Sequence, residues 1–172
     1  PEQIPAGATF SKFTPPGNTG LGFLEAVPDA AILSLADPDD SDGDGISGRP
    51  NWIKIPSYCV LRPGTIERNG KYIGRFGKKA AVYDLLQQTS NAYNQDMGIT
   101  STFEPKDVYS GLMIGPEVSD KTVHNVVFYL RTLKAPIQRN PQDPQVIQGK
   151  NIFIQTGCES CHKQTLTTKS SP

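Results

Sequence analysis

The chain has 172 residues, which is enough for one domain with its own core and a further fragment. Its 17 Lys and Arg residues balance its 17 Asp and Glu residues, so no basic surface indicates nucleic acid and no net charge indicates a membrane surface. No apolar run approaches the roughly 18 residues of a membrane-spanning helix, and no signal peptide is visible. Because the chain opens on Pro1 rather than methionine, we expect its true start to be missing.

The first part of the chain predicts loops around short helices. Residues 1–27 are rich in Pro, Gly and Thr and show no period, which is typical of a connector. Residues 29–36 predict a short helix with Ala31, Ile32 and Leu35 on one side. With 15 prolines and 16 glycines in the sequence, we expect long ordered loops between few helices.

The acidic stretch that follows has carboxylates at alternating positions. Asp40, Asp42 and Asp44 occupy the first, third and fifth positions of an EF-hand-type loop, and a glycine then allows the sharp turn. Hard oxygen ligands at this spacing suit calcium, so we expect these carboxylates and a backbone carbonyl near Ile46 to bind it. The twelfth position is Asn51 instead of glutamate, so such a site is incomplete or is completed from elsewhere. The alternative is a plain acidic Asp-Gly turn.

The middle of the chain predicts a small β-hairpin on a helical body. Asn69-Gly70 separates two short runs within residues 65–75, which is the strongest local signal for a hairpin. From residue 81 to about residue 94 the apolar spacing predicts a helix, with its apolar face formed by Val82, Leu85, Leu86 and Tyr93.

A loop and a second long helix come next. Residues 99–118 contain scattered Pro and Gly and predict loop. Ser119 or Asp120 is expected to cap a helix that stops before Pro136, with apolar positions at Val123, Val126, Val127, Leu130 and Leu133. His124 flanks this apolar face, and we expect a surface or packed side chain there instead of a metal ligand.

The helix that precedes the end of the chain has clear start and stop signals. Asp143 followed by Pro144 is typical of an N-cap and a first helical residue. Gly157 can end the helix. The apolar residues between them follow a partly helical pattern: Val146, Ile147, Phe153 and Ile154.

A Cys-x-x-Cys-His motif follows this helix directly. The spacing of Cys158 and Cys161 matches the two vinyl groups of haem, and His162 then lies where a neutral imidazole can bind the iron axially. A redox dithiol or half of a zinc site are the alternatives. A zinc site needs another pair of ligands, and only Cys59 and His124 remain, far apart in sequence. We therefore predict a covalent haem c, and we expect Cys59 to be buried and inert.

Attachment of haem c takes place beyond the bacterial inner membrane, so the expected compartment is the periplasm or a comparable extracytoplasmic space. Only 10 residues follow His162, which is too few to cover the second face of a haem. We therefore expect the chain to be a piece of a larger protein that is cut as its haem domain begins.

Several stretches together resemble the bacterial di-haem oxidoreductase family, also labelled thiol oxidoreductases and related to the di-haem cytochrome c peroxidases. The resemblance implies a linking region over residues 1–142 and the truncated start of a C-terminal, cytochrome c-like haem domain over residues 143–172. The implied fold is mainly α with long loops and a small β-hairpin. The matching stretches are Gly20–Pro28, Ala36–Asn51, Gly74–Gly77, Asp96–Thr100, Phe128–Leu133 and the haem motif.

The resemblance also implies catalytic residues. The related peroxidases carry a Gly-Arg, a helical Gln and a Glu-Met on the distal side of the haem that binds peroxide. The same order is found here in Gly74-Arg75, in Gln87 or Gln88, and in Asp96-Met97. Arg75, Gln88 and Asp96 are thus implied as catalytic, with Asp96 in place of the family's glutamate. The alternatives are an exposed helix residue for Gln88 and a helix-end hydrogen bond for Asp96.

These features predict part of a peroxidase-like di-haem oxidoreductase. Haem c at Cys158, Cys161 and His162 would relay electrons from a donor protein, and a second haem in the remainder of the parent chain would meet a small oxidant such as peroxide. A non-enzymatic c-type electron carrier is the alternative, which would show only six-coordinate low-spin iron. A third possibility is that this fragment by itself is a calcium-stabilised scaffold.

Overall fold

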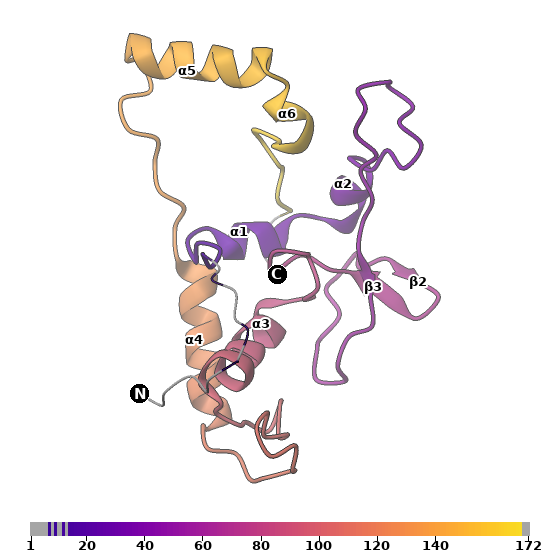
Figure 1. Ribbon diagram of the computed structural model, residues 1–172, viewed down its shortest axis with the longest axis vertical. Coiled ribbons are helices and arrows are strands. Elements are labelled where there is room, and N and C mark those ends of the chain that lie inside the picture. The colour runs from indigo at the N-terminus through magenta and orange to yellow at the C-terminus, as the bar shows by residue number, and fades with distance from the viewer. Residues whose placement is uncertain (1–6, 8, 10–11, 13, 170–172) are drawn as a thin grey trace.

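The computed structural model describes residues 7, 9, 12 and 14–169, and this part of the chain is rich in helix with one small sheet (Figure 1). The predicted helix-rich architecture with long loops is therefore confirmed. In chain order the elements are α1 (Leu21–Ala26), α2 (Asp29–Leu33), β1 (Trp52–Ile53), β2 (Glu67–Arg68), β3 (Lys71–Ile73), α3 (Leu85–Asn91), the π-helical turn η1 (Ala92–Asp96), α4 (Asp120–Thr132), α5 (Pro144–Gln155) and α6 (Cys158–Cys161).

The core forms where α3 and α4 pack together and α1 lies across them (Figure 1). α4 begins as predicted, because the Ser119 side chain accepts a hydrogen bond from the amide of Thr122. Its buried residues recur at helical spacing, so one stripe of the helix faces the core. The buried apolar residues that form this core cluster are Phe76, Val82, Leu85, Leu86, Val123, Val127 and Leu130.

The predicted hairpin is confirmed, and it belongs to a three-stranded antiparallel sheet. β3 lies between β1 and β2 and pairs with both. Asn69 and Gly70 connect β2 to β3 with φ angles of 53° and 69°. Positive φ at both central residues is what a tight two-residue hairpin turn requires. β1 adds a pairing of Trp52 with Ile73 that the local pattern did not predict.

Helix α1 corrects the prediction of a connector over residues 1–27. It spans six residues that were expected to be irregular, whereas residues 1–6, 8, 10–11 and 13 of that connector lie outside the described residues. The six-residue length is too short to show a period in the sequence. Its first turn follows Gly20 at φ 80°, and the amide of Gly20 donates to the carbonyl of Leu133 at 3.0 Å. The start of this helix is therefore fixed by a hydrogen bond between residues that are far apart in the sequence.

Two predicted helix boundaries are also wrong. The helix expected from residue 81 begins only at Leu85, because Val82 is held extended by a β-bridge to Phe76. The carboxylate of Asp84 then caps the helix by accepting from the amide of Gln87 at 2.8 Å. The helix expected over 29–36 ends at Leu33.

Helices α5 and α6 form an arm that projects from the body (Figure 1). α5 starts as predicted, with Asp143 capping the amide of Gln145 at 2.8 Å. α5, which is described over its full length, has no buried residue. The chain then returns to the body, where the amide of Lys169 donates to the carbonyl of Ala26 at 3.3 Å. Among the described residues, no helix has the length and apolar character needed to cross a membrane.

Candidate functional site

The Cys-x-x-Cys-His motif lies on the arm as one exposed helical turn. Cys158 and Cys161 are both free and exposed, and His162, also exposed, follows at the end of α6. The His162 amide donates to the Cys158 carbonyl at 2.9 Å, which folds the histidine back toward the first cysteine. The imidazole lies beside the ring of Phe153 with 6.1 Å between centroids. The two thiols and the imidazole are thus carried by one short exposed segment, residues 158–162.

The surroundings of the motif fit a large apolar group such as haem. Ile147, Ile152 and Ile154 of the adjoining helix are 44%, 49% and 37% exposed. Isoleucine side chains are usually buried, and Ile147 and Ile154, seven residues apart, lie on one side of a helix that has no buried residue. A bound apolar group could cover this side. A flat macrocycle with an apolar edge can do so. The residues present therefore fit the group that the motif predicts.

In the acidic loop, the observed group of carboxylates differs from the predicted set. Oxygens of Asp37, Asp40 and Asp42 lie within 4.8 Å of one another, and among the described residues Asp44 is outside this group. The amide of Gly45 donates to Asp40 at 3.0 Å, which closes the loop around these side chains. The pKa of Asp37 is lowered, chiefly because its carboxylate accepts from the backbone amide of Ser41.

Asp44 instead orders the exit of the loop and faces the arm. Its carboxylate accepts from the amide of Ile46 at 2.8 Å. Asp42 and Asp44 also line a hollow of about 270 Å³, together with Glu159 and Lys163 from the haem-motif segment. The acidic loop and α6 thus share a polar surface that the sequence did not predict. The sequence signal for Asp37 was its place at the start of the same acidic stretch, three residues before the expected first ligand.

Gln88 and Asp96 line one cavity of about 390 Å³ between α3, η1, α4 and residues 15–18. The carboxamide oxygen of Gln88 and the hydroxyl of Thr89 are both buried without a hydrogen-bond partner among the described residues. Asp96 ends the π-helical turn and is exposed. Such turns are frequent at functional sites, because the extra residue redirects side chains. The cavity therefore offers an acceptor, a hydroxyl and a carboxylate to a small molecule.

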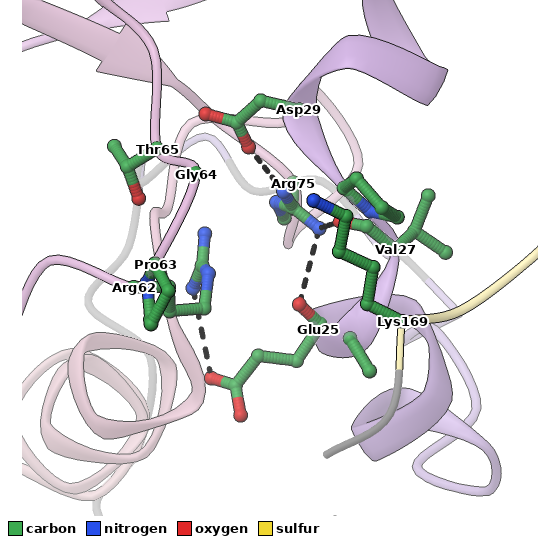
Figure 2. A pocket seen from close by; sticks show the side chains of 11 residues that line it. Glu25, Val27, Asp29, Arg62, Pro63, Gly64, Thr65, Arg75 and Lys169 are labelled. Atoms are coloured by element: carbon green, nitrogen blue, oxygen red, sulfur yellow. Dashed lines mark hydrogen bonds and ion pairs between the residues drawn. The ribbon is translucent and has the colours of Figure 1, made fainter. Parts of the chain in front are cut away.

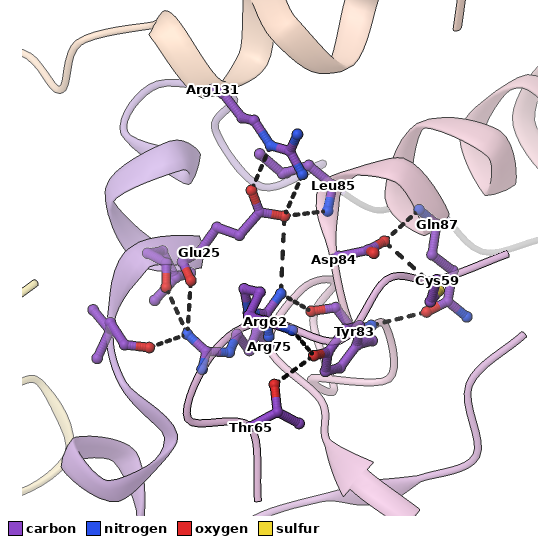
Figure 3. Close-up of polar contacts among 12 residues, drawn as sticks. Glu25, Cys59, Arg62, Thr65, Arg75, Tyr83, Asp84, Leu85, Gln87 and Arg131 are labelled. Carbon is purple, nitrogen blue, oxygen red and sulfur yellow. Dashed lines mark hydrogen bonds and ion pairs between the residues drawn. The ribbon is translucent and has the colours of Figure 1, made fainter. Parts of the chain in front are cut away.

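Arg75 lies apart from these two residues, in the interior of the body (Figure 3). Its side chain is 2% exposed and forms an ion pair with Asp29. The guanidinium also donates to the carbonyl oxygens of Leu24, Glu25 and Val27. Arg75 lines a different cavity, of about 140 Å³. The structure therefore brings Gln88 and Asp96 together but not Arg75.

The third cysteine belongs to the same polar network (Figure 3). Cys59 is half-buried, and its thiol donates to the Asp84 carboxylate at 3.8 Å. Burial, with a contribution from Asp84, raises the pKa of Cys59 to about 12. A neutral thiol is a poor nucleophile, so this environment supports the prediction of an inert cysteine. His124 is exposed, and its ring packs edge-on against that of Phe103 with 5.5 Å between the ring centroids. This agrees with the predicted surface position.

Together these features define a helix-rich protein that presents a Cys-x-x-Cys-His motif on an exposed arm. The family model described as "di-haem oxidoreductase, putative peroxidase" matches residues 13–172, and the chain belongs to that family. This match confirms the resemblance found in the sequence and identifies a haem-dependent, peroxidase-like oxidoreductase family. No curated protein matches the chain, and no solved structure does.

Proposed function

We propose that this chain is the linking region, residues 1–142, and the first helix of the C-terminal cytochrome c-like domain, residues 143–172, of a periplasmic or otherwise extracytoplasmic di-haem oxidoreductase. The observation that carries the proposal is the arm itself. It presents two free thiols and an imidazole in one turn, beside an apolar helix that the body leaves uncovered. Family membership supports the redox assignment.

The residues of the arm have separate roles in this proposal. The thiols of Cys158 and Cys161 would hold the haem through two thioethers, since addition of S–H to its vinyl groups needs no oxidant. His162 would hold the haem iron through an imidazole nitrogen, and the exposed isoleucines of α5 would help to exclude water from the bound group. Bound haem supplies reversible one-electron chemistry, which would serve transfer from an electron-donor protein.

The test is covalent haem retention. Protein made with a haem-maturation system should keep its haem during denaturing electrophoresis, and the double variant Cys158→Ser/Cys161→Ser should lose it. Cys59→Ser is the matched control and should keep full staining, because this thiol lies in the body. Loss of all haem from the unmutated chain on denaturation would reject the proposal.

We further propose that the cavity at Gln88 and Asp96 receives a small oxidant such as peroxide in the parent protein. The unpartnered oxygen of Gln88 can accept a hydrogen bond from a hydroperoxide O–H. Asp96, at the same cavity, can take up a proton and return it, and such help is typically worth about 10² to 10⁴ in rate. Arg75 is not included, because its hydrogen bonds hold the body together.

In the full-length parent, Asp96→Asn should slow the bimolecular oxidation of haem by peroxide about a hundredfold with unchanged haem spectra. Asp107→Asn is the control, because Asp107 lies outside the cavity and an amide can still accept from Ser110. A rate within a factor of about three of wild type, roughly 0.6 kcal/mol, would contradict this role. Exclusively six-coordinate low-spin iron at both haems would favour the electron-carrier alternative.

The acidic loop is proposed to bind one calcium ion through the carboxylates of Asp37, Asp40 and Asp42. Their oxygens already lie within 4.8 Å of one another, and a cation offsets their mutual repulsion. Asp44 and the carbonyl of Ile46, the other predicted ligands, follow directly in the chain. Millimolar calcium should raise the melting temperature relative to chelator, and Asp40→Asn should abolish the rise. Asp39→Asn, in the same loop but outside the group, should not.

A further inference from the structure

A second cavity, of about 140 Å³, lies where the turn between α1 and α2 meets residues 62–65 and the C-terminal tail (Figure 2). Five of the residues that line it are charged. Cationic and anionic side chains both point toward it, namely Arg62, Arg75, Lys169, Glu25 and Asp29, with the hydroxyl of Thr65 beside them.

Two guanidinium nitrogens of residues that line this cavity have no acceptor among the described residues. They are the Nε of Arg75 and an Nη2 of Arg62, and both atoms are buried. The other two nitrogens of Arg75 already donate to Asp29 and to three backbone carbonyls. A buried charged donor without a partner loses its hydration without compensation, so native proteins rarely leave one unpaired. An acceptor bound in the cavity would satisfy these donors.

The carboxylates nearby are already engaged and do not supply it. Asp29 is paired with Arg75 and accepts from the amide of Ile66 at 2.8 Å. Glu25 is held by Arg131 at 2.6 Å and by the amide of Leu85 at 2.9 Å (Figure 3). It lies only at the 4.0 Å limit from Arg62.

The two arginines also oppose each other electrostatically. The pKa of Arg75 is lowered, first by burial and then by the positive charge of Arg62. The ammonium of Lys169 adds a third positive group at the rim, where it comes near Gly64. A negative charge between these groups would reduce the repulsion.

We propose that this cavity is a binding site for one small oxoanion or carboxylate, held by Arg62 and Arg75 and closed by Lys169. Guanidinium N–H groups bind carboxylates and oxoanions through short charge-assisted hydrogen bonds. A water occupies about 30 Å³ in the liquid, so the volume has room for one anion of a few heavy atoms or a few waters. A cluster of waters is the competing occupant, but it supplies no charge.

The site goes beyond the proposed function, because its residues belong to the body and to the tail that follows the haem motif. Two sources can supply the anion: a free oxoanion such as sulfate, or the propionate of a bound haem. Lys169 comes seven residues after His162, so in either case the anion would fasten the tail against α1.

The test begins with the haem-free chain, so its failure is independent of haem attachment. Sulfate or acetate is titrated at constant ionic strength against chloride, while ¹⁵N spectra follow the Nε–H of Arg75. This resonance should shift with saturation, and the melting temperature should rise more than in chloride. Arg62→Gln should weaken binding of the anion about tenfold, as expected for loss of one charge-assisted hydrogen bond. Lys169→Gln, at an exposed position, should weaken it as well.

Arg139→Gln removes the same charge at an exposed position outside the cavity and should leave the titration unchanged. The absence of any shift at Arg75, or an equal response to chloride, would overturn the site and leave the cavity to water. Equal affinities for the wild-type chain and the Lys169→Gln variant would overturn the closing role of the tail. The titration is then repeated on the haem-loaded chain. If the Arg75 resonance no longer shifts with free anions, the haem propionate already occupies the site. If it still shifts, the ligand is a free oxoanion.

Discussion

At the scale of single residues, the three cysteines differ in what surrounds them. Cys158 and Cys161 are exposed on the arm, whereas Cys59 is half-buried beside a carboxylate that raises its pKa to about 12. Because the thiolate is the reactive form, iodoacetamide at pH 8 should modify the first two rapidly and Cys59 at least about tenfold more slowly. Peptide mass spectrometry of the haem-free chain measures all three rates. Equal rates at all three cysteines would contradict this environment.

The Asp84 carboxylate caps helix α3, but it is buried where a negative charge is poorly solvated. Burial raises its pKa, so protonation favours the folded state, and its contribution to stability falls as pH rises through that pKa. Asp84→Asn keeps an acceptor for the Gln87 amide without the buried charge. We expect it to unfold at higher urea than wild type at pH 8, with the difference closing as the pH is lowered.

Asp84→Ala provides the comparison, because it removes the cap together with the charge. It should lower the free energy of unfolding by about 1 kcal/mol relative to Asp84→Asn. If both variants were equally stable, the capping bond would not contribute.

Residues differ in how far the local sequence can predict their role. Cys158, Cys161 and His162 form a motif that can be read from the sequence alone, because its predicted chemistry depends on spacing within five residues. Arg75 was assigned to catalysis by resemblance, yet its partners come from residues about 50 positions earlier in the chain. No local pattern reports such pairings.

At the scale of elements, close backbone contacts fix how α1 lies on α4. A Cβ at Gly22 would come within 2.2 Å of the Arg131 carbonyl oxygen, which is backbone and cannot move aside. Gly22→Ala should therefore lower the free energy of unfolding by about 1–3 kcal/mol, although alanine normally favours a helix. Gly149→Ala in α5 is the matched control, since nothing lies within 4 Å of that position. Urea unfolding followed by tryptophan fluorescence should show a lower midpoint only for Gly22→Ala.

Elements with signals inside their own sequence were predicted well. The β2–β3 turn, the capped start of α4 and the Asp143-Pro144 start of α5 all depend on neighbouring residues. α1 and the late start of α3 depend instead on Leu133 and on the bridge between Phe76 and Val82. Tertiary contacts of this kind override local propensity.

At the scale of the whole molecule, the body and the arm are stabilised differently. The body has a core between α1, α3 and α4, whereas α5 has no buried residue and packs mainly on α6. Isolated helices shorter than about 12–15 residues are marginal in water. We therefore expect α5, with 12 residues, to open easily in the haem-free chain.

Hydrogen exchange tests this expectation. In the haem-free chain the amides of α5 should exchange much faster than those of α4 around Val123 and Val127, which are buried in the core. Haem attachment should slow exchange in α5 and leave α4 unchanged, because only α5 gains an apolar surface to cover its isoleucines. Along the chain, the slower exchange should begin near Asp143, where the proposed haem domain starts. Equal protection of α5 and α4 without haem would show that the arm is stable by itself, and that its exposed isoleucines do not depend on a cofactor for cover.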